Sequence, residues 1–85
     1  MNFLHSEVQV GPGQAIVVQL DHAANVQVMD DGDFHRYQQG QEHRYYGGLV
    51  KRSPAVIRPP HSGRWHVAID LGGYSGQVRA SVAVQ

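Results

Sequence analysis

The chain has 85 residues and a mass of 9.4 kDa, which suits one domain, 1–85, and leaves no room for a second independent core. Seven Lys and Arg balance seven Asp and Glu, so a polycation built for nucleic acid is disfavoured. The absence of cysteine excludes disulfides, iron–sulfur clusters and thiol nucleophiles. Apolar runs are short and the first residues do not resemble a signal peptide, so we expect a soluble, cytoplasmic protein.

Short segments with alternating apolar and polar residues, separated by glycine and proline, predict β-strands. In chain order they are residues 3–10, 15–20, 25–28, 55–57, 64–71 and 77–84. The first is the weakest prediction, because its alternation is clear only at Val8-Gln9-Val10. Six or more short strands with turns between them predict a sandwich or a barrel.

One segment, residues 30–40, departs from this alternation. Its Phe34 and Tyr37 stand three residues apart, as on one face of a helix, and it ends in a glycine. Either Asp31 or Asp33 can cap its N-terminus. Because one or two helical turns do not hold alone, we expect the two aromatic rings to anchor the segment against an open end of the sandwich.

The last two predicted strands permit a prediction of register. If 64–71 and 77–84 pair as a hairpin, their apolar sets share a face only when the loop has an even number of residues. The loop is then 74–75 or 72–75. Either loop brings Asp70 next to Arg79 on the solvent face, an ion pair worth about 0.2–1 kcal/mol.

We expect the alternating apolar residues of both sheets to form one core. They are Ile16, Val18, Val26, Val28, Trp65, Val67, Ile69, Val78, Ala80 and Val82.

Four stretches carry a family resemblance. They are residues 1–5, residues 24–30, the motif Tyr45-Tyr46-Gly47-Gly48 and residues 52–74, which include Pro60-His61-Ser62-Gly63-Arg64-Trp65-His66. Through them the whole chain resembles the bacterial domain-of-unknown-function family 1883. The resemblance implies an all-β, jelly-roll-like two-sheet antiparallel sandwich with one short helical turn. It also implies a domain that is sometimes fused to TIR domains as a sensing or recruiting module, and it carries over no catalytic residue.

Charge is divided unevenly along the chain. Residues 1–42 hold six acids and one Arg, whereas residues 43–85 hold six Lys or Arg and one acid. The cations and tyrosines of 43–64 suit an anion, a nucleotide or single-stranded nucleic acid, because Arg and Lys neutralise phosphate while Tyr stacks on a base. Alternatively, these cations face the acids of the first half, within one molecule or across a dimer.

The candidate ligand-binding residues are Arg44, Tyr45, Tyr46, Lys51, Arg52 and His61. Adjacent tyrosines can form a platform for a sugar or peptide, although one ring can instead pack beneath the loop. The first hypothesis is a non-catalytic binding or interaction module that uses the 43–53 loop for a protein partner or a small ligand. Binding of an anion, nucleotide or nucleic acid by the same segment is the second. Open edge strands also leave a homo-oligomer as an option.

A small enzyme or metal protein is the third hypothesis. The six histidines lack the spacing of a zinc site, and Asp30-Asp31-Gly32-Asp33 lacks the ligand order of a calcium loop. No GxSxG motif or carboxylate pair indicates catalysis. We therefore expect no enzyme, cofactor or metal. If several histidines meet at one interface, the protein should be pH-sensitive near their ordinary pKa of ~6.5.

Overall fold

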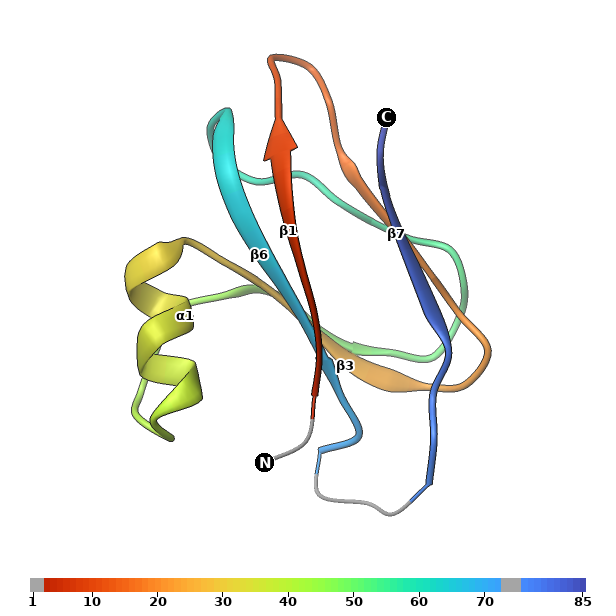
Figure 1. Cartoon of the computed structure of the whole chain (residues 1–85). Helices are drawn as coiled ribbons and strands as arrows, with labels where there is room; N and C mark the ends of the chain where they lie inside the picture. The colour runs from red at the N-terminus through yellow and green to blue at the C-terminus, as the bar shows by residue number, and fades with distance from the viewer. Residues whose placement is uncertain (1–2, 73–75) are drawn as a thin grey trace.

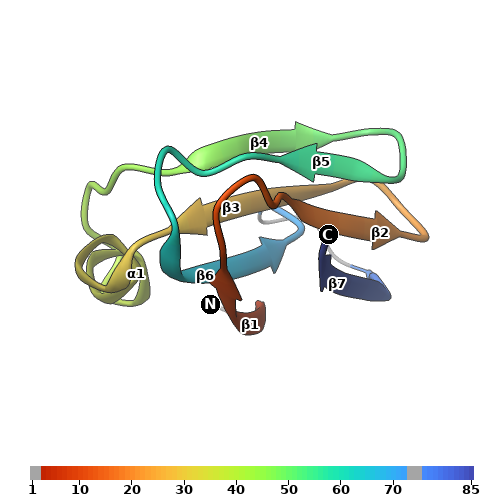
Figure 2. The ribbon, with the colours of Figure 1, turned by 90° about the horizontal axis from the view of Figure 1, so that it is seen from above.

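The computed structural model describes residues 3–72 and 76–85, which form three layers (Figure 1). The strands are β1 (Leu4–Val10), β2 (Ile16–Leu20), β3 (Ala24–Met29), β4 (Tyr46–Val50), β5 (Ala55–Ile57), β6 (Gly63–Asp70) and β7 (Ala80–Val84), and the helix is α1 (Asp31–Gln38). One antiparallel sheet has the order β1-β6-β3-β4 and faces a second with the order β5-β2-β7. The helix lies outside the first sheet (Figure 2), so the predicted all-β sandwich with one short helix is confirmed.

The core between the sheets is built from aliphatic residues around one tryptophan. Its buried members are Val10, Ile16, Val18, Ala24, Val26, Val28, Trp65, Val67 and Ile69. Seven of the ten predicted core residues belong to it, and the other three, Val78, Ala80 and Val82, pack against it half-buried. Alternation along the strands therefore placed this core correctly.

A second, smaller cluster lies on the outer face of the four-stranded sheet, under α1. It contains Met29, Phe34, Tyr37 and Ala68, with Phe3 packed against it. Both helix aromatics anchor α1, as predicted, but the predicted place is wrong. They cover the middle of a sheet and not an open end, because β3 and β6 turn Met29 and Ala68 outward.

The prediction of the helix cap is also wrong by one residue. The cap is Asp30, whose extended backbone and carboxylate suit that position, and its Oδ1 accepts a hydrogen bond of 2.8 Å from the backbone N–H of Asp33. Asp31 is instead the first residue of the helix, which frees its carboxylate for contacts with the sheet.

The predicted pairing of the last two strands is wrong as well. β6 lies between β1 and β3, whereas β7 pairs with β2 in the other sheet. Asp70 is buried under α1 and does not lie on a solvent face. The two apolar sets do enter one core, but from opposite sheets, and alternation alone does not distinguish a facing strand from a neighbouring one. Residues 73–75, which include the predicted loop 74–75, lie outside the described residues.

The prediction of one continuous loop over 43–53 is wrong, because its middle is a strand. β4 pairs antiparallel with β3, from Ala24 opposite Val50 to Val28 opposite Tyr46. Glycine is rare in strands, so two glycines obscured this one. Gly47 is required where it stands, since its φ is +115° and a Cβ there would collide with the carbonyl oxygen of Val26.

Candidate functional site

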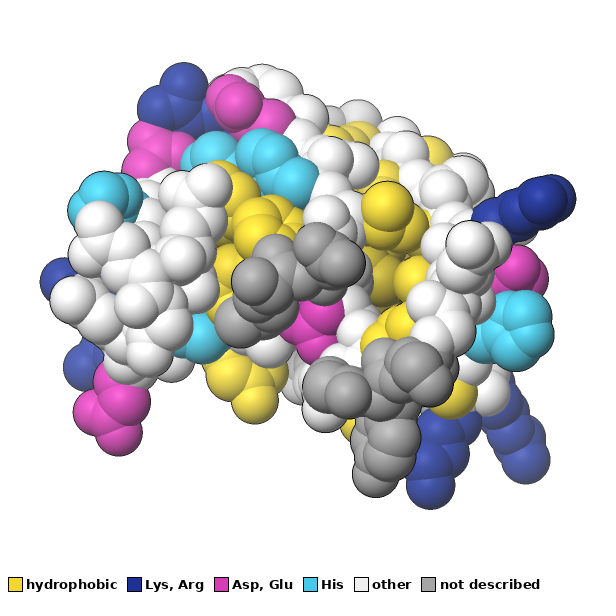
Figure 3. Space-filling model, turned by 60° about the horizontal axis from the view of Figure 1, so that its bottom comes forward, with side chains coloured by type: hydrophobic (Ala, Val, Ile, Leu, Met, Phe, Trp, Pro, Cys, Tyr) yellow, Lys and Arg dark blue, Asp and Glu magenta, His cyan; other side chains and the backbone are white. Residues whose placement is uncertain are grey.

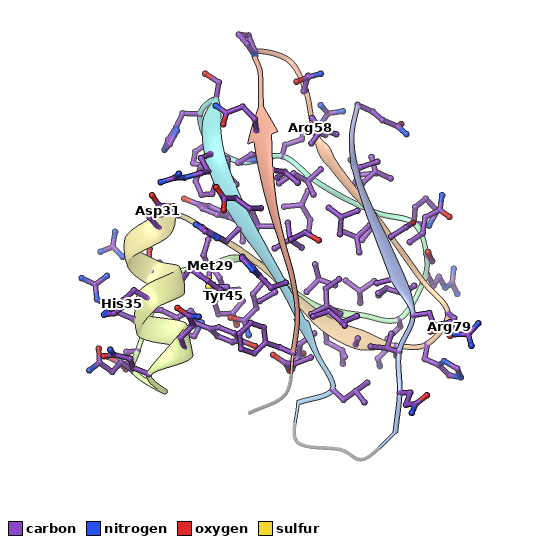
Figure 4. The ribbon with its side chains drawn as sticks, in the orientation of Figure 1. Met29, Asp31, His35, Tyr45, Arg58 and Arg79 are labelled. Atoms are coloured by element: carbon purple, nitrogen blue, oxygen red, sulfur yellow. The ribbon has the colours of Figure 1, made fainter. Side chains whose placement is uncertain are left out.

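Two of the predicted site residues, Arg44 and Tyr45, lie at the start of β4 on the helix side. The backbone N–H of Arg44 donates to Asp33 Oδ1 at 3.1 Å, which ties this segment to α1. The ring of Tyr45 tilts against His43 with centroids 5.6 Å apart. Figure 4 shows Tyr45 on the helix side of the molecule, whereas Arg58 and Arg79 stand at different ends of the second sheet.

Tyr46 and His61 meet at the buried tryptophan. The ring of Tyr46 stands edge-on to Trp65 with centroids 6.0 Å apart, and the His61 ring lies 4.9 Å away from the same indole. The indole N–H donates to the carbonyl oxygen of His61 at 3.0 Å. Tyr45 and Tyr46 therefore turn to different neighbours and do not form the paired platform considered from the sequence.

Lys51 and Arg52 lie beyond the other end of β4. Both are exposed, and with Asp21, His22 and Ser53 they line a shallow hollow of about 160 Å³. Five of the six predicted residues therefore lie in β4 or next to its ends, from Arg44 to Arg52, and His61 contacts the same Trp65 as Tyr46. We call residues 44–52 the β4 edge.

The β4 edge is the free margin of its sheet. Among the described residues, β3 is the only strand hydrogen-bonded to β4, and β5 lies beside it (Figure 2) but pairs with β2. Between residues 45 and 50 the edge carries no charge, and its Tyr45, Tyr46 and Leu49 are 47%, 44% and 62% exposed. Strand β1, at the other margin, carries Glu7. A charge on an edge strand is a common protection against unwanted pairing, and β4 has none.

The acids of the first half of the chain neutralise only some of the cations of the second half. Arg64 pairs with Asp31, and its Nη1 lies 3.5 Å from Glu7 Oε1, as the intramolecular alternative expects. Within the described residues, Lys51, Arg52 and Arg58 form no salt bridge. Figure 3 shows most Lys and Arg side chains spread around the rim of the visible face.

A polar network on the outer face of the four-stranded sheet was not predicted. His66 Nε2 lies 2.5 Å from Asp31 Oδ1, and His66 Nδ1 lies 2.9 Å from His5 Nε2. Figure 3 shows two histidine side chains side by side, next to acidic and basic side chains. The Arg64 guanidinium, and then His66, hold the pKa of the Asp31 carboxyl below its usual range.

A second part of this network surrounds the buried Asp70. The hydroxyl of Tyr37 donates to its Oδ2 at 2.6 Å, while Asn25 Nδ2 and the backbone N–H of Gly72 donate to its Oδ1 at 3.2 and 2.8 Å. Burial, and then the carboxylate of Asp70, raise the pKa of the Tyr37 phenol. The phenol is therefore a fixed donor that fastens α1 to β6.

Within residues 3–72 and 76–85, no three or more His, Asp or Glu side chains converge as a metal site would require. No helix in that part of the chain is long and apolar enough to cross a membrane.

The family model described as "Domain of unknown function (DUF1883)" matches residues 1–85, the whole chain. The chain belongs to this family. The family resemblance drawn from the sequence is thereby confirmed, whereas the fusion to TIR domains stays a prediction. No curated protein and no solved structure matches the chain.

Proposed function

We propose that this member of DUF1883 is a non-catalytic interaction module, which takes an extended, acidic segment of a partner protein along its β4 edge. The observation that carries the proposal is the β4 edge, which pairs with β3 alone among the described residues, exposes Tyr45, Tyr46 and Leu49, and has cations at both ends. An added strand would gain main-chain hydrogen bonds from such an edge.

Backbone pairing supplies affinity in this mode, and side chains supply selectivity. Tyr45 and Leu49 are four residues apart, on either side of Gly47. Large exposed apolar side chains gain most from being covered, at roughly 25 cal/mol per Å² of buried apolar surface. The edge therefore combines open backbone groups with apolar contacts.

Charge favours an acidic partner segment over a second copy of this chain. A two-fold pairing that keeps all of β4 in register centres on Gly48, and it places Arg44 of one copy opposite Arg52 of the other. Like charges directly opposite in an antiparallel pair are destabilising. An acidic segment instead meets Arg44 at one end and Lys51 and Arg52 at the other.

A nucleotide or single-stranded nucleic acid would bind through the same cations, and the experiment below can also detect such binding. The divergence of Tyr45 and Tyr46 supports the peptide, because base stacking favours rings that are both free. We place the module in the bacterial cytoplasm, with recruitment beside TIR domains as one setting. That part of the proposal rests on the family resemblance and not on the geometry.

The test is an NMR titration of the ¹⁵N-labelled full chain with a short peptide that alternates valine with threonine and has glutamates at both ends. We expect amide shifts concentrated in β4 and at its partners in β3. A matched peptide with two central prolines, which removes two backbone donors, should bind at least about tenfold more weakly. Equal binding of the two peptides contradicts strand addition.

Two double variants of equal charge change test the role of the flanking cations. Lys51→Glu with Arg52→Glu should weaken binding of the acidic peptide by about tenfold or more, since each rim charge contributes on the order of 1 kcal/mol. Arg58→Glu with Arg79→Glu, outside the β4 edge, should leave the affinity within about twofold. A thymidine oligonucleotide that binds more tightly than the peptide at equal salt would favour the nucleic-acid function instead.

A further inference from the structure

One chain of hydrogen bonds on the outer face joins three separate elements. Asp31 begins α1, His66 lies in the middle of β6, and His5 lies near the start of β1. The contacts of 2.5 Å between Asp31 Oδ1 and His66 Nε2, and of 2.9 Å between His66 Nδ1 and His5 Nε2, run through both imidazoles. Figure 4 places Asp31 at the end of the helix that is nearest the sheet.

The ring of Phe34 holds the two imidazoles in place. It stacks on His5 with centroids 4.3 Å apart and on His66 with centroids 4.5 Å apart, at interplanar angles of 12° and 5°. The imidazoles themselves lie 5.2 Å apart at 15°. A change in the position of either imidazole therefore disturbs the packing of α1.

We propose that His5 and His66 form an acid-sensitive latch, which holds α1 and the start of β1 on the sheet at neutral pH and releases them when both imidazoles are protonated. The Asp31 carboxylate can only accept, so Nε2 of His66 carries a proton. When both rings are neutral, His66 Nδ1 accepts the proton that His5 Nε2 donates. When one proton is added, His66 becomes the imidazolium and its Nδ1 donates to His5 Nε2. The hydrogen bond between the two rings therefore survives one added proton.

A second extra proton breaks the contact. Both facing nitrogens then carry a hydrogen at 2.9 Å, and neither offers a lone pair. Two positive rings also repel each other, as like charges at this distance do. Because His5 is the more exposed of the two, it is the ring that turns out to solvent and takes the start of β1 with it.

Several other charged or titratable groups surround the pair of imidazoles. The charged or titratable side chains that the packed elements contribute are Glu7 from β1, Arg64 and Asp70 from β6, and Asp31, Asp33, His35, Arg36 and Tyr37 from α1. The single positive charge of Arg64 pairs with both Asp31 and Glu7, and Tyr37 donates to Asp70. Strand β3 presents the uncharged Asn25, Gln27 and Met29 to this face.

The direction of the pKa of His5 agrees with this geometry. Burial lowers it below the ordinary value of 6.5, and the charge of His66 lowers it further, against a smaller opposite effect of Glu7. A base whose pKa is lowered by folding binds more protons in the unfolded chain. The latch is therefore fully stabilising above about pH 6.5 and weakens as the pH falls below that value.

Release exposes the apolar cluster beneath α1. Phe34 is part of both the aromatic stack and this cluster, so loss of the stack uncovers Met29 and Ala68. The inner core has no titratable member and keeps the two sheets together. Acid should thus open one layer of the molecule and leave the sandwich folded.

The test is hydrogen exchange and imidazole titration by NMR on the full chain, from about pH 8 to about pH 5. After correction for intrinsic rates, we expect amides of α1 and of the start of β1 to exchange at least about tenfold faster at the acid end, with β2 and β3 unchanged. His5 should titrate below its ordinary pKa of 6.5. Titration of His5 at or above that value overturns the proposal.

Two variants separate the latch from mere loss of stability. His5→Phe keeps a ring on Phe34 but takes no proton, so the acid-induced exchange of α1 should disappear even if the protein is less stable throughout. His22→Gln changes an exposed histidine outside the network and should keep the full acid response. If His5→Phe does not fold, His5→Gln serves the same purpose. An acid response that persists in the His5 variant overturns the proposal.

Discussion

The two faces of the four-stranded sheet are made by the same strands and held by different chemistry. The inner face packs Val26, Val28 and Val67 into a dry core against the second sheet. The outer face packs His66 and Asp70 under α1, with hydrogen bonds, stacked rings and a few apolar contacts. The stability of the inner face comes from apolar area removed from water, which does not depend on pH or on the angle of each contact. The stability of the outer face comes from hydrogen bonds, which depend on the angle between donor and acceptor and on protonation.

A small sandwich can therefore attach a pH-sensitive layer without risk to its core. A packed apolar face tolerates little change in volume, and a polar face responds to a single lost donor or an added proton. Substitutions on the two faces should therefore differ in size and in their dependence on pH.

The largest expected effect is on the inner face. Trp65→Ala removes the largest core side chain and should lower the free energy of unfolding by about 3–5 kcal/mol, measured by urea unfolding. A domain of this size has about 5 kcal/mol or little more in total, so the variant should be largely unfolded. Leu49→Ala, at an exposed position on β4, should stay within about 0.5 kcal/mol. A loss below about 1 kcal/mol for Trp65→Ala contradicts its place in the core.

Next comes the buried hydrogen bond of the outer face. Tyr37→Phe keeps the ring but leaves Asp70 Oδ2 without its donor, and it should destabilise the fold by about 1–3 kcal/mol. The matched control is Tyr45→Phe, whose hydroxyl lies on an exposed ring and should matter little. Thermal unfolding of both variants at neutral pH makes the comparison, and equal behaviour would argue against a role for the phenol.

A smaller effect belongs to the start of the helix. Asp30→Ala removes the acceptor for the backbone N–H of Asp33 and should destabilise by about 0.5–2 kcal/mol, with faster hydrogen exchange in α1. Asp30→Ser supplies another capping oxygen and should recover most of the loss. Failure of the serine to rescue would show that the carboxylate charge and not the cap is what counts.

The smallest effect comes from the exposed ion pair. Arg64→Gln should lower the melting temperature slightly at pH 7 because Asp31 loses the partner that lowers its pKa. A carboxyl whose pKa is lowered by folding stabilises above its ordinary value of 3.8 and loses that contribution as the pH falls. The difference from wild type should therefore shrink as the pH falls below 3.8 and vanish once Asp31 is protonated in the folded protein. Arg58→Gln, with no salt bridge in the described residues, should show no such dependence.

The sequence predicted the inner face well and the pairing of strands poorly. Alternation at Val67, Ile69 and Val82 places each residue on a buried face but contains no information on which strand lies next to it. Strand β4 was missed because Gly47 and Gly48 have low strand propensity, and only contact with Val26 explains why glycine is needed. Both errors arise from contacts between residues far apart in the chain.

The outer face was harder still, because its network joins residues 35 and 61 positions apart. One signal was present in the sequence: β6 places Ala68 between His66 and Asp70 on its second face, and α1 offers two aromatic rings that need a covering partner. A small residue between polar ones on a central strand indicates close packing against another element. The predicted site residues are spread along β4 because they were chosen as neighbours in the sequence. A strand places such neighbours along its length and does not gather them at one point.

Strand β6 reaches its position late, and this has a consequence for the protein as it is made. Among the described residues β1 pairs with β6 alone, from Leu4 opposite Ile69 to Val10 opposite Gly63, so it waits for this partner until most of the chain exists. At about 5–20 residues per second, a ribosome needs several seconds to cross that interval. During this time Val8 and Val10, which belong to the future core, have no β6 to cover them.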